Sequence, residues 1–182
     1  MKNFKFIIYL FIVIILSQSS IKSQTNMKQN STSLYWLTLG AGFFSNKDFG
    51  GFGGNINASY YSKIGLLSVR FLDAANSGAE PVNVITNDYR LNHINEISGM
   101  YGLNYHISFL FLSLSTGVGM VWIKKGVSPS EVTSTTLGLP IDAEIFISPL
   151  PMLGIGLKLI GNLNSKSSYR GILICIQLGK LK

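Results

Sequence analysis

Five charged residues stand in stretches of the sequence where apolar and polar residues alternate. They are Arg70, Glu96, Asp142, Glu144 and Lys158, and each falls on the polar side of its alternation. Successive side chains of a β-strand point to opposite faces, so the five charges are expected on the same face of a sheet. Opposite charges on one face attract, and we predict an internal network of ion pairs. A gated ion path or a small-solute site is the alternative.

The pairing of these charges can be estimated from the connections between their strands. A turn centred near Leu150 places residue i opposite about residue 300 minus i in an antiparallel pair, so Asp142 is expected to face Lys158. Arg70 and Glu96 become neighbours if the strands on either side of the long connection between them pair with each other.

One further group of residues has the types needed for hydrolysis. His106, Ile107 and Ser108 place a histidine and a serine two residues apart, a spacing that resembles that of outer-membrane lipid A deacylases. A catalytic triad also needs an acid within hydrogen-bond reach. The nearest acid along the chain, Glu96, lies ten residues up the same strand, which is about 33 Å at strand rise. We therefore predict no catalytic residue.

Other residues that often carry chemistry have no suitable partners in the sequence. His93 has no second histidine or cysteine at metal-ligand spacing, and no helix is expected after the glycine-rich stretch 50–54, which excludes a dinucleotide motif. Cys175 is the only cysteine. It cannot form a disulfide within the chain. We predict no cofactor and no metal site.

The first residues have the order of a secretory signal peptide. Lys2 and Lys5 precede an unbroken apolar run, Phe6 to Leu16, and then a stretch of small and polar residues, Ser17 to Gln24. The apolar run, taken as a helix, reaches only about 16 Å, roughly half of the hydrocarbon core of a bilayer. We predict a signal peptide over residues 1–23 and a short periplasmic segment over residues 24–33.

Composition indicates one folded domain. The 182 residues are 47% hydrophobic and 13% charged, which is too apolar for a disordered chain. Without Lys2, Lys5 and Lys22 the 15 basic residues fall to 12 against 8 acidic ones, and the formal charge falls from +7 to +4. This small and scattered excess argues against a nucleic-acid partner.

Apolar residues recur with period two along the rest of the chain, which predicts strands. We predict eight of them: Leu34 to Phe44, Gly51 to Tyr61, Gly65 to Asp73, Leu91 to Tyr105, Phe109 to Lys124, Thr135 to Ser148, Met152 to Leu163 and Tyr169 to Leu181.

Short and long connections alternate between these strands. The short ones are Ser62 to Ile64, His106 to Ser108 and Pro149 to Pro151, whereas the long ones include Ala74 to Arg90 and Lys125 to Ser134. Such alternation is typical of a membrane β-barrel with periplasmic turns and extracellular loops.

The polar face of these strands is dominated by glycine, serine and asparagine, not by the lysine and glutamate of a solvated surface. Small residues suit a narrow lumen, with the apolar face turned to lipid. Aromatic residues are expected as two girdles. The periplasmic girdle would contain Tyr60, Tyr61, Tyr105, Phe109 and Phe146, and the extracellular girdle Phe43, Phe44, Phe71, Trp122 and Tyr169.

The chain from Leu34 to Lys182 resembles the small eight-stranded outer-membrane barrels of the OmpA transmembrane-domain and OmpX type, particularly the short versions common in Bacteroidetes. The closing segment Gly171 to Lys182 resembles the final strand that the barrel-assembly machinery reads in that family, although it lacks a terminal aromatic residue. The resemblance implies an all-β, up-and-down antiparallel barrel in the outer membrane, surrounded by its lipid.

The expected function is a structural or surface-interaction role: envelope integrity, adhesion, or binding of an extracellular protein or glycan by the loops. Eight strands enclose little more than their own side chains, so the lumen is predicted to be plugged. The alternatives are a narrow passive pore, a lipid-modifying enzyme, and a soluble periplasmic barrel that binds an apolar ligand.

Overall fold

The computed structural model describes residues 33–46, 50–76, 81–83, 88–107, 109–127 and 130–181. The predicted signal peptide and nearly all of the predicted segment 24–33 lie outside the described residues. The strands are β1 (Leu34–Ser45), β2 (Gly50–Ser62), β3 (Gly65–Asn76), β4 (Pro81–Asn83), β5 (Asp88–Ile107), β6 (Leu110–Val127), β7 (Ser130–Leu150), β8 (Leu153–Asn164) and β9 (Tyr169–Lys180). Within these residues, no helix has the length and apolar character needed to cross a membrane.

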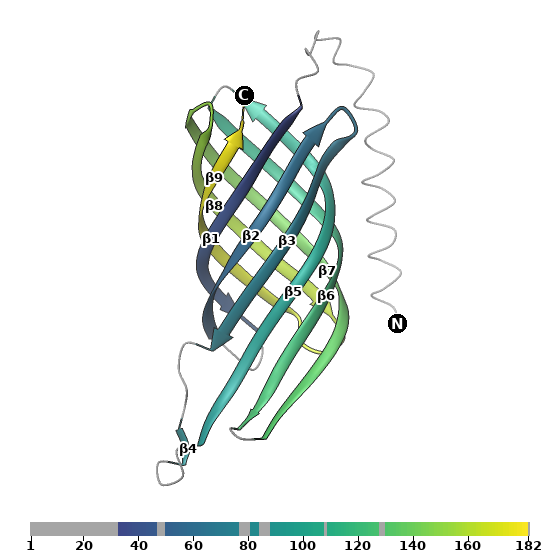
Figure 1. Ribbon diagram of the computed structural model, residues 1–182, viewed down its shortest axis with the longest axis vertical. Coiled ribbons are helices and arrows are strands. Elements are labelled where there is room, and N and C mark those ends of the chain that lie inside the picture. The colour runs from purple at the N-terminus through teal and green to yellow at the C-terminus, as the bar shows by residue number, and fades with distance from the viewer. Residues whose placement is uncertain are drawn as a thin grey trace. The chain divides into compact units, whose positions relative to one another are not determined.

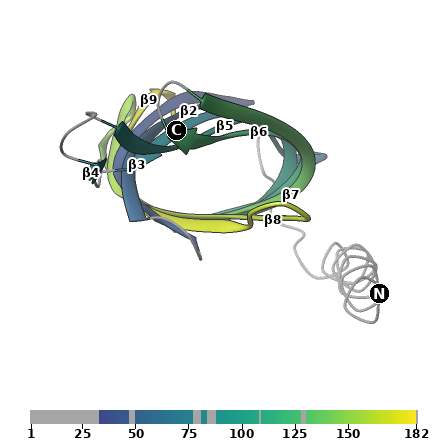
Figure 2. The ribbon, with the colours of Figure 1, turned by 90° about the horizontal axis from the view of Figure 1, so that it is seen from below.

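Eight of the strands close into a barrel. Every pairing is antiparallel, neighbours in sequence are neighbours in the sheet, and the ring closes where β1 pairs with β9. β3 pairs with β5 because the short β4 lies outside the ring and pairs with β5 alone (Figures 1 and 2). All eight predicted strands are present, and the predicted up-and-down barrel is confirmed.

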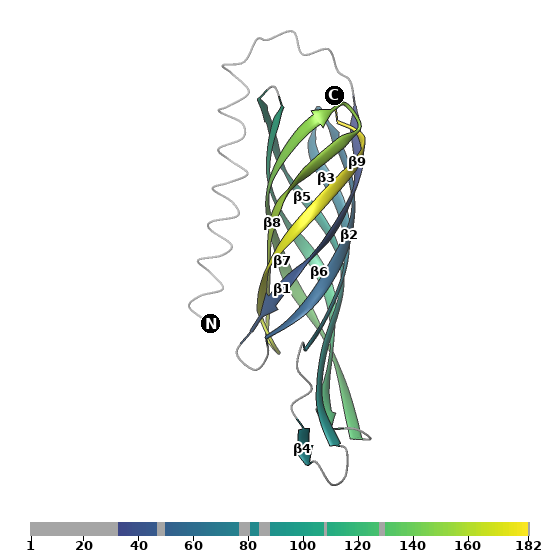
Figure 3. The ribbon, with the colours of Figure 1, turned by 90° about the vertical axis from the view of Figure 1, so that its left-hand side faces the viewer.

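The two ends of the barrel differ. At one end the chain enters at β1 and leaves at β9, and tight turns such as Lys63–Ile64 and Pro151–Met152 join the strands. At the other end β5, β6 and β7 run well past the rest of the barrel (Figure 3). The predicted loop from Lys125 to Ser134 is therefore wrong, since β6 continues to Val127 and β7 begins at Ser130. The predicted loop from Ala74 to Arg90 likewise contains β4 and the ends of its neighbours.

The barrel has the polarity of a membrane protein. Its outward side chains are apolar and open to the surroundings, as at Val118 (66% exposed) and Ile174 (69%), whereas Thr38 and Asn57 are buried inside. A soluble barrel would bury its apolar residues and expose its polar ones. The observed arrangement, with polar groups inside and an apolar band outside, is that of a barrel in lipid.

The prediction of two aromatic girdles is wrong for the residues that point inward. Phe44, Phe146 and Tyr169 are at most 4% exposed and pack in the interior. Tyr60, Tyr105, Phe109, Phe43 and Phe71 are exposed on the outside, as expected. Inward and outward side chains alternate along a strand, and these inward aromatic residues have the parity of the polar face.

Candidate functional site: an ionic network in the lumen

The structure brings the five charged residues predicted from the sequence into one network inside the barrel. Arg70 stands at its centre, on β3. Its Nε donates to Glu96 Oε1 at 3.2 Å, and a second guanidinium nitrogen forms an ion pair with the same oxygen. β3 pairs with β5, and in this pairing Leu72 lies opposite Glu96, so Arg70 and Glu96 are diagonal neighbours.

A second contact of Arg70 crosses the lumen. Its other terminal nitrogen forms an ion pair with Asp142 Oδ1 on β7. In the ring β5 and β6 lie between β3 and β7, so these two strands have no backbone pairing with each other. Only side chains can join them, and the guanidinium occupies the interior between them.

Lys158 on β8 joins the two acids of β7. Its Nζ lies 2.8 Å from Asp142 Oδ2 and 2.7 Å from Glu144 Oε1. The predicted register, with Asp142 directly opposite Lys158, is wrong by two residues, because Glu144 is the residue opposite Lys158. The turn is centred between Pro151 and Met152 and not near Leu150, which moves the count by three residues, and the ladder shift between Ile147 and Leu150 takes one residue back.

Three further polar residues complete the network, and the sequence analysis did not include them. Asn162 Nδ2 donates to Glu96 Oε2 at 2.8 Å, Tyr169 donates its hydroxyl to the same oxygen, and Ser113 Oγ donates to Glu144 Oε2 at 3.0 Å. The alternation that places Lys158 inside also places Asn162 inside, four residues along β8. The network thus reaches from β3 to β9 through side chains of six strands.

The network is shut off from solvent. The side chains of Arg70, Asp142 and Lys158 are 0% exposed. Inward apolar residues pack toward both ends of the barrel: Trp36, Leu66 and Phe111 near the end with the tight turns, and Leu72, Ile94 and Ile123 near the protruding end. With all groups ionised, two cations face three carboxylates, so the cluster carries a formal charge of −1.

Both histidines lie on β5, thirteen residues apart. His93 lies on the outside and forms a pair with Asp73 through its Nε2, and among the described residues no serine or threonine hydroxyl joins that pair. The ring of His106 stacks on Phe111 at 4.2 Å. Its predicted partner Ser108 lies outside the described residues. No group of three metal-ligating side chains occurs among the described residues.

Solved structures share this architecture. The chain matches Neisserial surface protein A (TM-score 0.61, 13% identity, 81% of this chain and 98% of that one). It also matches Ail, the attachment invasion locus protein of Yersinia pestis (TM-score 0.57, 10% identity, 82% and 98%). A third match is the N-terminal β-barrel domain of Pseudomonas aeruginosa OprF (TM-score 0.52, 11% identity, 81% and 99%). No protein-family model and no curated protein matches the sequence.

The chain has the fold of the small eight-stranded outer-membrane β-barrels. The matches cover nearly the full length of the solved chains, so the shared feature is the whole barrel and not a fragment of sheet. At 10–13% identity they establish the fold alone. The resemblance to a Bacteroidetes subtype stays a prediction.

Proposed function

We propose that this outer-membrane barrel is a closed, non-enzymatic scaffold that presents a protruding β-sheet to extracellular partners. The N-terminal segment would act as the export signal, and the barrel would reside in the outer membrane with its tight turns in the periplasm. One of the structural neighbours, Ail, is named as an attachment invasion locus protein. The observation that supports the proposal for this chain is the shape of its β5–β6–β7 sheet.

That sheet has one covered edge and one open edge. β4 pairs with the outer part of β5. On the other side, β7 pairs with β8 only from Gly138 to Leu150, so residues 130–137 have strand partners in β6 alone. An unpaired strand edge offers a row of backbone donors and acceptors to an added strand. Residues 132–137 are rich in threonine, carry no charge, and include Val132 at 69% exposure.

The occupant that fits this edge is an extended peptide segment of an extracellular protein. A lysine on the edge should block it, because charged side chains oppose edge-to-edge pairing. We expect peptides selected from a phage-displayed random library on the barrel in nanodiscs to lose at least tenfold in affinity for V132K. Ala75→Lys adds the same charge at an exposed position on β3, which β5 and β6 separate from β7, and should bind like wild type. Equal binding by V132K, or no selectable peptide, would contradict the proposed edge.

The closed lumen gives a separate prediction. Arg70 crosses the interior and is fully buried, which argues against the passive-pore alternative. We therefore expect wild-type barrels in planar bilayers to give no steady ion current. Removing the crossing side chains in an Arg70→Ala, Asp142→Ala double variant should produce openings. The folded state of each variant is checked first by the shift between unboiled and boiled samples on a detergent gel. A steady current through the wild-type protein would overturn the closed scaffold.

A further inference from the structure

On β9 the apolar band of the outer wall ends at a basic residue on the side of the protruding sheet. Along β9 the outward residues are Leu178, Ile176, Ile174 and Ile172, and the next outward residue is Arg170. The change from apolar to charged side chains on a barrel wall marks the level of lipid headgroups. Arg170 lies toward the protruding end, which faces the outer leaflet in the proposed orientation. Within the described part of the chain it has no ion-pair partner.

The neighbours of Arg170 leave its guanidinium uncovered. Its cross-strand partners are Ser45 on β1 and Gly161 on β8, two of the smallest residues. A Cβ at Gly161 would meet nothing closer than Ile141 O at 3.8 Å, so the barrel itself does not require glycine there. The missing side chain contributes to a hollow of ≈ 400 Å³ that Gly161 and Arg170 both line.

Directly below this row the wall becomes apolar. Leu159, Ile172 and Phe43 follow one another across β8, β9 and β1, and with Arg170 and Ser45 they line a second hollow of ≈ 420 Å³.

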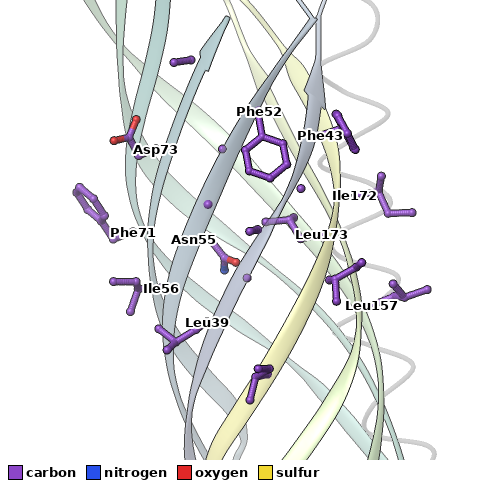
Figure 4. A pocket seen from close by; sticks show the side chains of 18 of the residues that line it. Leu39, Phe43, Phe52, Asn55, Ile56, Phe71, Asp73, Leu157, Ile172 and Leu173 are labelled. Atoms are coloured by element: carbon purple, nitrogen blue, oxygen red, sulfur yellow. The ribbon is translucent and has the colours of Figure 1, made fainter. Parts of the chain in front are cut away.

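Phe43 and Ile172 also line a hollow of ≈ 1190 Å³, which extends further along the barrel wall (Figure 4). There Ala41 lies opposite Gly54, and the small pair makes a depression between larger side chains such as Leu39 and Phe52. The three hollows together form a groove that is polar at Arg170 and apolar along the rest of its length.

We propose that Arg170 and the apolar hollows beneath it hold one phosphate-bearing lipid of the surrounding leaflet. A guanidinium binds phosphate oxygens in a bidentate, charge-assisted geometry. The phosphate lies at Arg170 between Ser45 and Gly161, and an acyl chain runs over Ile172 and Phe43 toward the Ala41 depression. The site depends on the membrane location proposed above but not on the peptide-binding edge, which lies on different strands.

Native mass spectrometry of the full barrel released from detergent tests this assignment. The probes are dimyristoylphosphatidylglycerol, which has a phosphate, and dimyristoylglycerol, which has the same acyl chains without one. We expect wild type to retain one molecule of the phospholipid, and Arg170→Gln to retain at least fivefold less. Gly161→Ile, which fills the space beside the guanidinium, should reduce retention to a similar degree. Lys63→Gln removes an equal charge at the opposite end and should behave like wild type.

Several outcomes would overturn the site. If wild type and Arg170→Gln retain the phospholipid equally, the guanidinium does not bind the phosphate. If wild type retains the phospholipid and the diacylglycerol equally, the site recognises acyl chains alone. Displacement of the phospholipid by millimolar inorganic phosphate would show a free-anion site in place of a lipid site. Each variant is first checked for the heat-dependent gel shift. If the variants still bind the selected peptides as wild type does, a failure of the lipid site is distinguished from a failure of the proposed β7 edge.

Discussion

Replacing Arg70 by methionine is expected to destabilise the barrel by about 3–5 kcal/mol, the usual cost of leaving buried charges without their partner. Arg70 is fully buried and is the cation that both Glu96 and Asp142 contact. Its removal takes the formal charge of the cluster from −1 to −2 in a region that water does not reach. Urea unfolding of the barrel in lipid vesicles measures the effect.

A compensated variant separates charge from packing. Arg70→Met combined with Glu96→Gln and Asp142→Asn leaves Lys158 paired with Glu144, so the cluster becomes neutral. Replacing a whole buried ionic group is often close to neutral in stability, whereas removing one member is not. We expect the triple variant to recover more than half of the loss. A triple variant as unstable as Arg70→Met would show that the arginine acts through its volume and not through its charge.

Ile174→Lys is the second large effect, and it tests the polarity of the barrel. Ile174 lies midway along β9 among outward apolar residues and is 69% exposed. A lysine near the midplane of a bilayer costs about 2–4 kcal/mol on the lipid face of a barrel. On a water-exposed surface the same change would stay within about 0.5 kcal/mol.

The matched control is Val132→Lys. Val132 has the same exposure, 69%, but lies on the part of β7 that runs past the barrel. We expect its free energy of unfolding to change by no more than about 0.5 kcal/mol. Comparing the free energies of unfolding of the two variants in vesicles therefore shows whether two equally exposed side chains face lipid or water. If the two lysines have equal effects, the wall of the barrel does not face lipid.

Residue types and their alternation were enough to predict the eight strands and the face on which each charge lies. This follows from the strand backbone itself, which sends successive side chains to opposite sides whatever the rest of the fold does. The inward position of Tyr169 was available from the same rule, since it shares its parity with Cys175 and Gln177. For Tyr169 the alternation along β9 indicates the correct face, whereas its aromatic type suggests the wrong one.

Contacts between strands required the tertiary structure. The position of the β7–β8 turn and the ladder irregularity beside it together decided that Lys158 lies opposite Glu144 and not opposite Asp142. The alternation does not distinguish these two registers, because they differ by two residues and keep the same faces. The pairing of His93 with Asp73 also depends on how β3 and β5 align. The contact between Arg70 and Asp142 exists only because the sheet closes and brings β3 and β7 to face each other across the lumen.

Residue order was therefore enough to predict the eight barrel strands, their inward and outward faces and the set of buried charges, because these depend on the local geometry of the backbone. Only the folded barrel shows which charges meet, how far β5, β6 and β7 extend past the barrel, and where the outer wall is hollowed. Those features depend on register and closure, which are set by all eight strands together.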